Sequence, residues 1–183
     1  NLGNTLKKLG RTDEVLASYR RALDIDPGRQ DLHHLISSIS RETTDIAPEK
    51  NIRELFDDYA GTFDDHLTNT LSYEIPALLR HAVDALTDAP KAFSRMLDLG
   101  CGTGMVAQAF QDLAGEIDGI DLSPKMLEIA KAKGVYANLT LSDVLEFLNG
   151  PDVKPAGYEL IASGNTFIYI GKLDGVFAAA RRA

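Results

Sequence analysis

The sequence predicts an α/β protein in which a parallel sheet alternates with helices, and in which a purely helical segment comes first. From residue 93 onward, apolar runs of strand length alternate with stretches of helical period, which is typical of βαβ units. Before residue 87, apolar residues instead recur every three or four positions, as they do along one face of a helix. The run LDLGCGTG (97–104) also brings three glycines together directly after the first predicted strand, which indicates a sharp turn there.

Residues 91–183 are predicted to form the sheet and its helices. The predicted strands cover 93–99, 116–121, 136–141 and 158–163, and the predicted helices cover 103–113, 124–133, 143–148 and a stretch from about 172. Ser123 suits the N-cap of the second helix, and Pro124 suits its first position. Parallel strands joined in this way require right-handed crossovers, and ligands then bind at the carboxyl ends of the strands.

Residues 1–42 are predicted to form helices that end at Gly10 and at Asp26-Pro27-Gly28, with a third helix over about 30–42. The pattern resembles a tetratricopeptide repeat, which packs two helices closely in about 34 residues. The residues that match are Asn1-Leu2-Gly3, Leu6, Gly10, Tyr19, Ala22-Leu23 and Asp26-Pro27. The resemblance implies a surface for a protein partner, and an ordinary helical hairpin without a recognition role is the alternative.

The polar stretch 43–50 is predicted to be a linker, and 51–90 a helical lid segment. Phe56, Tyr59, Phe63 and Leu67 recur at helical spacing, although Gly61 weakens the helix between them. These apolar side chains suit either plain core packing or a lid across a ligand pocket, and the two interpretations are compatible. Pro76 is predicted in the first turn of a second helix that ends at Leu86.

Composition argues against several classes of partner. The net charge of −8 disfavours nucleic acid and anionic membrane surfaces, both of which attract an excess of lysine and arginine. Cys101 is the one cysteine, so an intrachain disulfide is impossible and a cytoplasmic location is expected. The histidines and the cysteine show no metal-site spacing. Because both ends fall inside helical patterns, we expect the chain to be part of a longer protein, with the sheet continuing after its fourth strand.

The glycines at 100, 102 and 104 leave backbone bare at the expected ligand edge of the sheet. Dinucleotide sites use the spacing G-x-G-x-x-G and bind a pyrophosphate, whereas Met105 here stands where that pattern has its last glycine. Asp98, two residues before the first glycine, is poorly suited to a pyrophosphate and well suited to a cationic group. The glycine run therefore favours a positively charged ligand over a nicotinamide dinucleotide.

Two more carboxylates follow the next two predicted strands. Asp121 lies about 20 residues after the first glycine, where a carboxylate accepts both hydroxyls of a ribose. Asp143 in LSDVLEF suits an adenine amino group, with Val144 against the ring, or alternatively the cap of the helix that follows. A ligand with an amine, a ribose and an adenine but no phosphate is S-adenosylmethionine.

Residues 94–183 resemble a class I methyltransferase, whose sheet is Rossmann-like. The signatures are LDLGCGTG (97–104), GIDLSPKMLEIAK (119–131), LSDVLEF (141–147) and the fourth-strand region from Tyr158. LFDDYAGTFDDHL (55–67) resembles the stretch before the methyltransferase in a bacterial group with N-terminal tetratricopeptide repeats. The resemblance implies S-adenosylmethionine as cofactor, bound by Asp98, Gly100, Cys101, Gly102, Gly104, Asp121, Leu122, Met126, Asp143, Val144, Tyr59 and Ser163.

The implied activity is methyl transfer to a small-molecule acceptor. Transfer from a sulfonium needs alignment and exclusion of water more than a protein nucleophile, so no catalytic residue is predicted. Tyr59 and His66 are the side chains to test as a base, and Asn165 stands where the family often has an acidic residue. The alternatives are a repeat-bearing scaffold with an inactive methyltransferase-like part, and a nicotinamide-dependent enzyme.

Overall fold

The computed structural model describes residues 12–25, 49–86 and 93–183, which fall into two compact units. In the first unit, helix α2 (Thr12–Ile25) buries Val15 and Tyr19 against neighbouring apolar side chains of the same helix. The predicted second helix is therefore confirmed. The helices predicted before residue 10 and over 30–42, most of the linker, and the predicted helix end at 87–90 lie outside the described residues.

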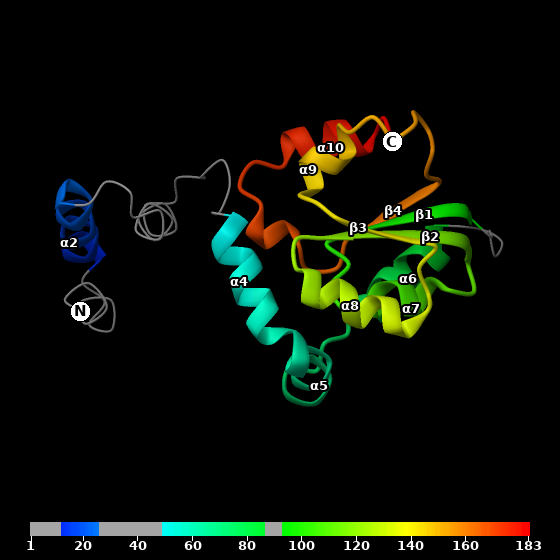
Figure 1. Ribbon diagram of the computed structural model, residues 1–183, viewed down its shortest axis with the longest axis horizontal. Coiled ribbons are helices and arrows are strands. Elements are labelled where there is room, and N and C mark those ends of the chain that lie inside the picture. Colours follow the sequence, from blue (N-terminus) through cyan, green and yellow to red (C-terminus); the bar gives the residue numbers. More distant parts are fainter. Residues whose placement is uncertain (1–11, 26–48, 87–92) are drawn as a thin grey trace. The chain divides into compact units, whose positions relative to one another are not determined.

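The second unit is built on four parallel strands in the order β3-β2-β1-β4, as Figure 1 shows. The strands are β1 (Phe93–Leu99), β2 (Ala114–Asp121), β3 (Asn138–Leu141) and β4 (Leu160–Ala162). At the level of Asp98, the neighbouring residues are Gly119 on β2 and Ala162 on β4. Asp98 is thus flanked by two small residues, which leave room for other side chains beside it.

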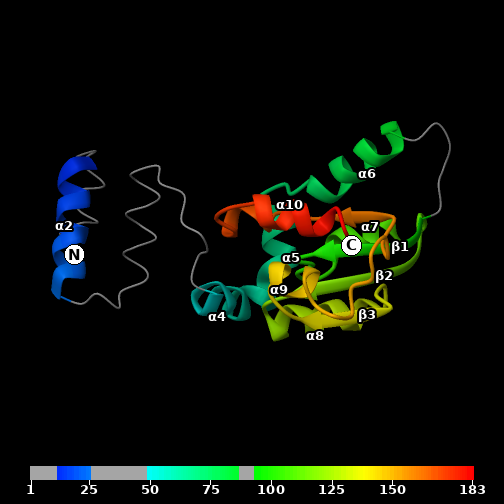
Figure 2. The same ribbon diagram turned by 90° about the horizontal axis from the view of Figure 1, so that it is seen from above.

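Helices cover both faces of the sheet, so the unit has three layers (Figures 1 and 2). One face carries α6 (Ile75–Leu86), α7 (Met105–Phe110) and α8 (Pro124–Lys133), and the other carries α9 (Val144–Leu148) and α10 (Asp174–Ala180). The core between the sheet and α7 contains Met96, Phe110 and Ile117. Half-buried side chains of α6 pack against this core. The predicted parallel α/β sheet is confirmed.

Local signals set the bounds of α8. The Ser123 hydroxyl accepts a hydrogen bond from the Met126 N–H at 3.1 Å, Pro124 occupies the first helical position, and Gly134 ends the helix with a left-handed φ of 68°. The predicted bounds 124–133 are therefore confirmed. β1 also has its predicted bounds of 93–99, whereas β2, β3, β4, α7, α9 and α10 start or end a few residues from their predicted ranges, because their ends carry weaker local signals.

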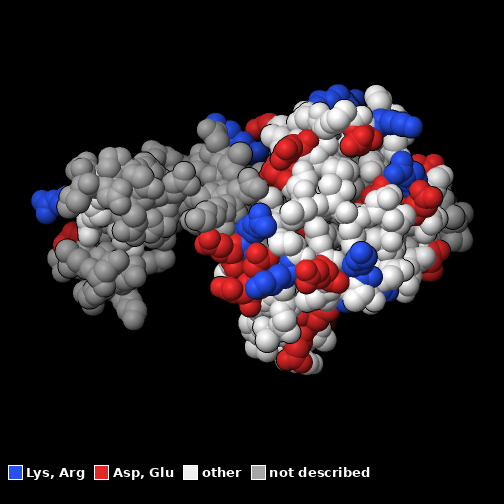
Figure 3. Space-filling model, in the orientation of Figure 1, with Lys and Arg blue, Asp and Glu red and all other residues white. Residues whose placement is uncertain are grey.

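Residues 49–70, here named the covering segment, form an irregular helix. Helix α4 (Glu49–Tyr59) leads into a 3₁₀ turn η1 (Ala60–Thr62), a single turn α5 (Phe63–Asp65) and a π-helical turn η2 (His66–Thr70). Helix α4 starts inside the stretch predicted to be a linker, and the regular α-helix ends just before Gly61, as expected from that residue. Acidic and basic side chains lie next to one another on the face shown in Figure 3.

Candidate functional site

The loop after β1 turns through three glycines in left-handed conformation. Their φ angles are 65° at Gly100, 53° at Gly102 and 95° at Gly104, a region that other residues enter only with strain. The Cys101 N–H donates to the Ile120 carbonyl at 2.8 Å, which ties the loop to the end of β2. The glycine run is therefore required by backbone geometry, independently of any ligand.

Protein side chains lie against two of the three glycines. A Cβ at Gly100 would stand 2.1 Å from the Thr166 hydroxyl, and one at Gly104 would stand 3.0 Å from the Tyr136 ring. A Cβ at Gly102 would meet only the Phe63 ring, at 3.8 Å. Gly102 is thus the position where bare backbone faces space that a ligand could approach, whereas Gly100 and Gly104 make room for the protein itself.

Asp98 is fully buried beneath this loop. Its Oδ2 accepts a hydrogen bond from the Tyr136 hydroxyl at 2.8 Å, whereas Oδ1 is buried without a hydrogen-bond partner. Burial raises the pKa of Asp98 to about 7, the hydrogen bond from Tyr136 opposes that rise, and the nearby Asp121 carboxylate adds to it. A buried oxygen without a partner costs free energy, so a cationic donor at Oδ1 would be strongly favoured.

Tyr136 was missed by sequence reasoning. Its ring lies over Gly119 of β2, where an added Cβ would come within 2.7 Å, and its hydroxyl reaches Asp98. Burial and the Asp98 carboxylate raise the pKa of Tyr136, so this phenol stays protonated and donates. The two residues are 38 positions apart in the chain, and no local pattern connects them.

Asp121 ends β2 and faces the glycine loop. Its Oδ2 accepts from the Gly102 N–H and its Oδ1 from the Ser123 N–H, each at 2.8 Å. Burial raises its pKa and these N–H groups oppose the rise. Because each carboxylate oxygen offers two lone pairs, one acceptor position remains on each oxygen after these bonds. The backbone N–H groups thereby fix the orientation of the Asp121 carboxylate.

Asp143 caps α9, as the alternative interpretation expected. Its Oδ1 accepts from the Leu145 N–H at 2.7 Å and from the Glu146 N–H at 3.1 Å. Val144 and, on α8, Met126 are buried. The cap does not exclude a contact with adenine, because it occupies one of the two carboxylate oxygens.

The remaining predicted residues surround the loop in different ways. The Ser163 hydroxyl donates to the Leu99 carbonyl at 3.0 Å, so Ser163 supports the end of β1. The thiol of Cys101 is buried, and burial raises its pKa, which leaves it protonated and unsuited to nucleophilic attack. Tyr59 packs its ring edge-on against Phe63 at 5.0 Å and hydrogen-bonds His66 Nδ1 through its hydroxyl. Leu122 is half-buried next to Asp121.

Comparison with known proteins identifies this arrangement. Residues 96–183 match a family model described as a methyltransferase domain. This part of the chain is therefore similar to methyltransferase domains. The S-adenosylmethionine-dependent methyltransferase of Leishmania major aligns over 74% of this chain and 56% of its own, with a TM-score of 0.60 and 20% identity. A TehB-like methyltransferase from Corynebacterium glutamicum aligns over 71% of this chain and 67% of its own, with a TM-score of 0.51 and 23% identity. These two likenesses show the shared fold.

Curated relatives align over part of the chain. Human methyltransferase-like protein 27 is 40% identical over 90 residues, covering 47% of this chain and 35% of that protein. The carboxy-S-adenosyl-L-methionine synthase of Wolinella succinogenes is 37% identical over 96 residues, covering 48% and 40%. The ubiquinone biosynthesis O-methyltransferase of Thiobacillus denitrificans is 42% identical over 59 residues, covering 32% and 25%. The chain thus spans well under half the length of these relatives.

The methyltransferase domain fits S-adenosylmethionine on three observations. Asp98 Oδ1 is buried without a hydrogen-bond partner, which suits a cationic donor. Gly102 in the loop after β1 leaves its backbone uncovered except for the Phe63 ring. Asp121 is held by backbone N–H groups with acceptor positions to spare for ribose hydroxyls. Asp98, residues 100–104 and Asp121 are here named the cradle.

Residues 12–25, 49–86 and 93–183 contain no group of three or more His, Cys, Asp or Glu side chains placed to hold a metal ion. No helix in those ranges is both long and apolar enough to cross a membrane.

Proposed function

We propose that this protein is an S-adenosylmethionine-dependent methyltransferase that acts on a small-molecule acceptor. The observation that carries the proposal is the buried Oδ1 of Asp98, which has no hydrogen-bond partner at the end of the strand that leads into the glycine loop. A neutral or anionic ligand would leave that carboxylate without compensation, whereas a cationic one removes the cost. The names of the curated relatives support a small acceptor, since they include a ubiquinone biosynthesis O-methyltransferase and a carboxy-S-adenosyl-L-methionine synthase.

The residues of the cradle have distinct roles in this proposal. When bound, S-adenosylmethionine supplies a methyl group that is already activated by its sulfonium. Asp98 Oδ1 accepts from the ammonium group, Asp121 accepts from the ribose hydroxyls, and Asp143 accepts from the adenine amino group. Gly102 allows close approach, and the Phe63 ring shields that backbone from water.

No residue is proposed as a catalytic base. Alignment of the acceptor and exclusion of water supply a large part of the acceleration for this type of displacement. Tyr59 and His66 hydrogen-bond each other, which makes them the pair to substitute if the acceptor proves to be a hydroxyl or a protonated amine. Asn165 is exposed and has no acidic group to offer.

We further propose that residues 1–42 are tetratricopeptide-like and bind a protein partner. The support is helix α2, in which Val15 and Tyr19 are buried, although Val15 stands where such repeats usually have a small Ala. Deleting residues 1–42 is expected to leave cofactor binding unchanged and to remove binding to that partner. A cytoplasmic location stays a prediction from the cysteine usage.

Titration calorimetry with S-adenosylhomocysteine tests the proposed function. The Asp121→Ala variant is expected to bind about 10- to 100-fold more weakly, because it lacks the acceptors for two hydroxyls of a ribose. Asp121→Asn keeps one acceptor oxygen, so its affinity is expected to lie between those of the wild type and Asp121→Ala. Glu128→Ala on the exposed side of α8 is the control and should bind normally. Stabilisation of the protein by NAD but not by S-adenosylhomocysteine would overturn the proposal.

A further inference from the structure

Tyr73 lies in the turn between η2 and α6, and its side chain reaches the ligand edge of the sheet. Its hydroxyl is 2.9 Å from the position that a Cβ at Gly164 would take. Gly164 comes two residues after the end of β4, and β4 pairs with β1 so that Ala162 is opposite Asp98. The Tyr73 hydroxyl therefore lies at the carboxyl ends of β1 and β4, on the strand pair that carries Asp98.

The backbone before Tyr73 is strained. Ser72 has a left-handed φ of 48°, a region that a residue with a Cβ enters only at a cost in free energy. The Tyr73 N–H then donates to the Leu67 carbonyl at 3.0 Å, which closes the turn. Strain of this kind persists where the surrounding structure requires it, and it is concentrated at sites that bind ligands. The strained turn fixes the point at which Tyr73 leaves the backbone.

The Tyr73 hydroxyl has no hydrogen-bond partner among the described residues. It does not donate to Asp98, whose Oδ1 is buried without a partner. Tyr73 is half-buried, burial raises its pKa, and the nearby Asp98 carboxylate raises it further. The phenol therefore keeps its proton, so it is suited to donate a hydrogen bond and unsuited to act as a base.

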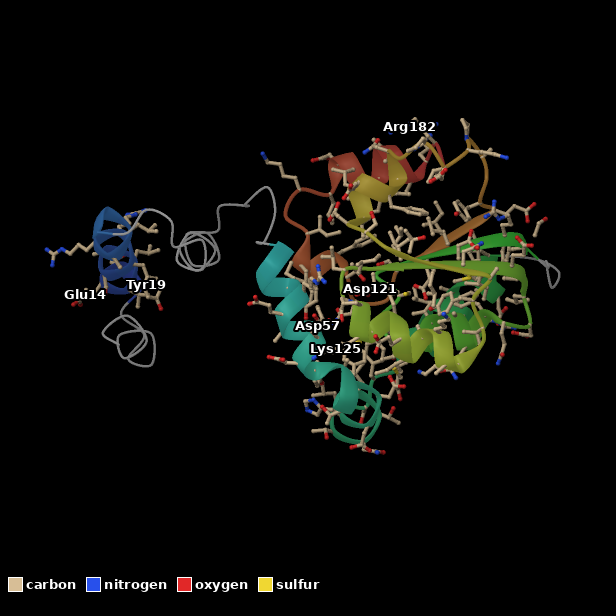
Figure 4. The ribbon with its side chains drawn as sticks, viewed as in Figure 1. Glu14, Tyr19, Asp57, Asp121, Lys125 and Arg182 are labelled. Atoms are coloured by element: carbon tan, nitrogen blue, oxygen red, sulfur yellow. The ribbon has the colours of Figure 1, made fainter. Side chains whose placement is uncertain are left out.

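The order of the strands separates the two ends of the cradle. Asp121 ends β2 on one side of β1, and Figure 4 shows it close to Asp57 and Lys125. Gly164 and the Tyr73 hydroxyl are on the other side of β1, after β4. A ligand with its ribose at Asp121 and its ammonium group at Asp98 therefore extends its remaining end toward β4.

Asp98 and Tyr73 together offer one acceptor and one donor that the described part of the protein does not use. An α-amino acid carries its ammonium and carboxylate groups on the same carbon atom, so their two protein partners must also be neighbours. The buried carboxylate oxygen suits the ammonium group, and the phenol suits the carboxylate. A hydrogen bond to an ionised carboxylate is stronger than one between neutral groups.

We propose that Tyr73 binds the α-carboxylate of S-adenosylmethionine and makes the site select ligands whose amino-acid end is complete. This inference rests on the proposed function of the cradle. Tyr73 donates its O–H to the carboxylate, while Asp98 accepts from the ammonium group on the same carbon. An adenosyl amine without the carboxylate keeps the bond to Asp98 and loses the bond to Tyr73, which discriminates between the two ligands.

Titration calorimetry at pH 8 with two ligands tests this role. S-adenosylhomocysteine has both groups, and S-adenosyl-3-thiopropylamine is the same molecule without the carboxylate. The wild type is expected to bind S-adenosylhomocysteine about tenfold or more tightly than the amine. Tyr73→Phe removes only the hydroxyl, so it should bind S-adenosylhomocysteine about tenfold or more weakly than the wild type, and the amine within about twofold.

Two further variants serve as controls. Tyr158→Phe also removes one phenol hydroxyl, but the partner of that hydroxyl is Asp118, outside the cradle, so both Kd values should stay unchanged. Asp98→Asn should abolish binding of both ligands, because both carry the ammonium group. Misfolding of Tyr73→Phe cannot imitate the expected result, since it would weaken the binding of both ligands.

The outcomes separate failure of this inference from failure of the cofactor site. Equal weakening of both ligands by Tyr73→Phe would overturn the inference, because the hydroxyl would then act on a part that the ligands share. Unchanged binding of both ligands, or equal affinity of the wild type for the two, would overturn it and leave the proposed function intact. If the wild type binds neither ligand, the proposed function fails and this inference fails with it.

Discussion

Replacing Asp98 by asparagine should stabilise the protein at alkaline pH and abolish binding of the cofactor. The carboxyl is fully buried, has one oxygen without a partner, and burial raises its pKa from the ordinary 3.8 to about 7. Between those two pH values the folded protein holds a proton that the unfolded chain releases. The free energy of unfolding therefore falls as pH rises through this window, and the full cost is present above about pH 7.

The size of the effect follows from the width of that window. About 1.4 kcal/mol for each pH unit between 3.8 and about 7 gives a cost of about 4 kcal/mol at pH 8, which is an upper figure. Asparagine removes this cost and can still accept from Tyr136, but its buried amide donors lack partners, at about 1–3 kcal/mol. The net expectation is a gain of about 1–3 kcal/mol at pH 8 that turns into a loss of similar size near pH 4.

Urea unfolding at pH 8, 6 and 4, followed by circular dichroism, measures this dependence. Asp118→Asn is the control, because Asp118 is equally buried but accepts hydrogen bonds from Arg95, Asn138 and Tyr158. It should destabilise the protein at pH 8, where Asp98→Asn stabilises it. A change in stability for Asp98→Asn that is the same at all three pH values would refute the reasoning.

Binding gives a second measure of the same carboxyl. A cationic ammonium group binds the ionised form of Asp98, so the affinity of the wild type for S-adenosylhomocysteine should rise with pH through about 7. At pH 6, where only about a tenth of the carboxyl is ionised, Kd should be about tenfold higher than at pH 8. Asp98→Asn should remove detectable binding at both pH values.

Two further predictions concern the loop and the cap. Gly100→Ala should lower the free energy of unfolding in urea by about 2–4 kcal/mol, because the new Cβ meets Thr166 and the left-handed backbone is strained. Adding Thr166→Ala should recover only the part of this loss that comes from the clash with Thr166. Asp143→Ala should cost about 1 kcal/mol as a lost cap. Asp143→Ser should keep the cap but weaken binding of S-adenosylhomocysteine in calorimetry, and unchanged affinity would contradict the proposed contact with adenine.

Much of the fold was predictable because its signals are local. The run from Met96 to Leu99 is buried throughout, as a central parallel strand requires, so its apolar character marked β1 correctly. Ser123, Pro124 and Gly134 bounded α8 through cap chemistry that acts over a few residues. The ends of β3 and β4 were placed less well, because a short strand ends where its neighbour stops pairing, and the pairing partner is distant in the chain.

The candidate site was predictable in part. The glycines and the acidic residues at or after the ends of β1, β2 and β3 occur at recognisable spacings, so the sequence could name Asp98, Asp121 and Asp143 as candidates, and their contact with a ligand stays a prediction. Their partners were not predictable. For Asp143 the sequence left two roles open, a contact with adenine and a helix cap. Only the hydrogen bonds from the N–H groups of Leu145 and Glu146 show that it caps α9.

By itself the sequence determined the parallel α/β class, the place of the glycine turn and the carboxylates around it, because hydrophobic period, caps and glycine spacing act within a few residues. Only the tertiary structure decided that Thr166 and Tyr136 fill two of the three glycine positions, that Asp98 keeps one oxygen unpartnered, and that Asp64 lies over the loop. These contacts join residues about 30 or more positions apart. They depend on how helices and loops meet across the sheet, which no local pattern encodes.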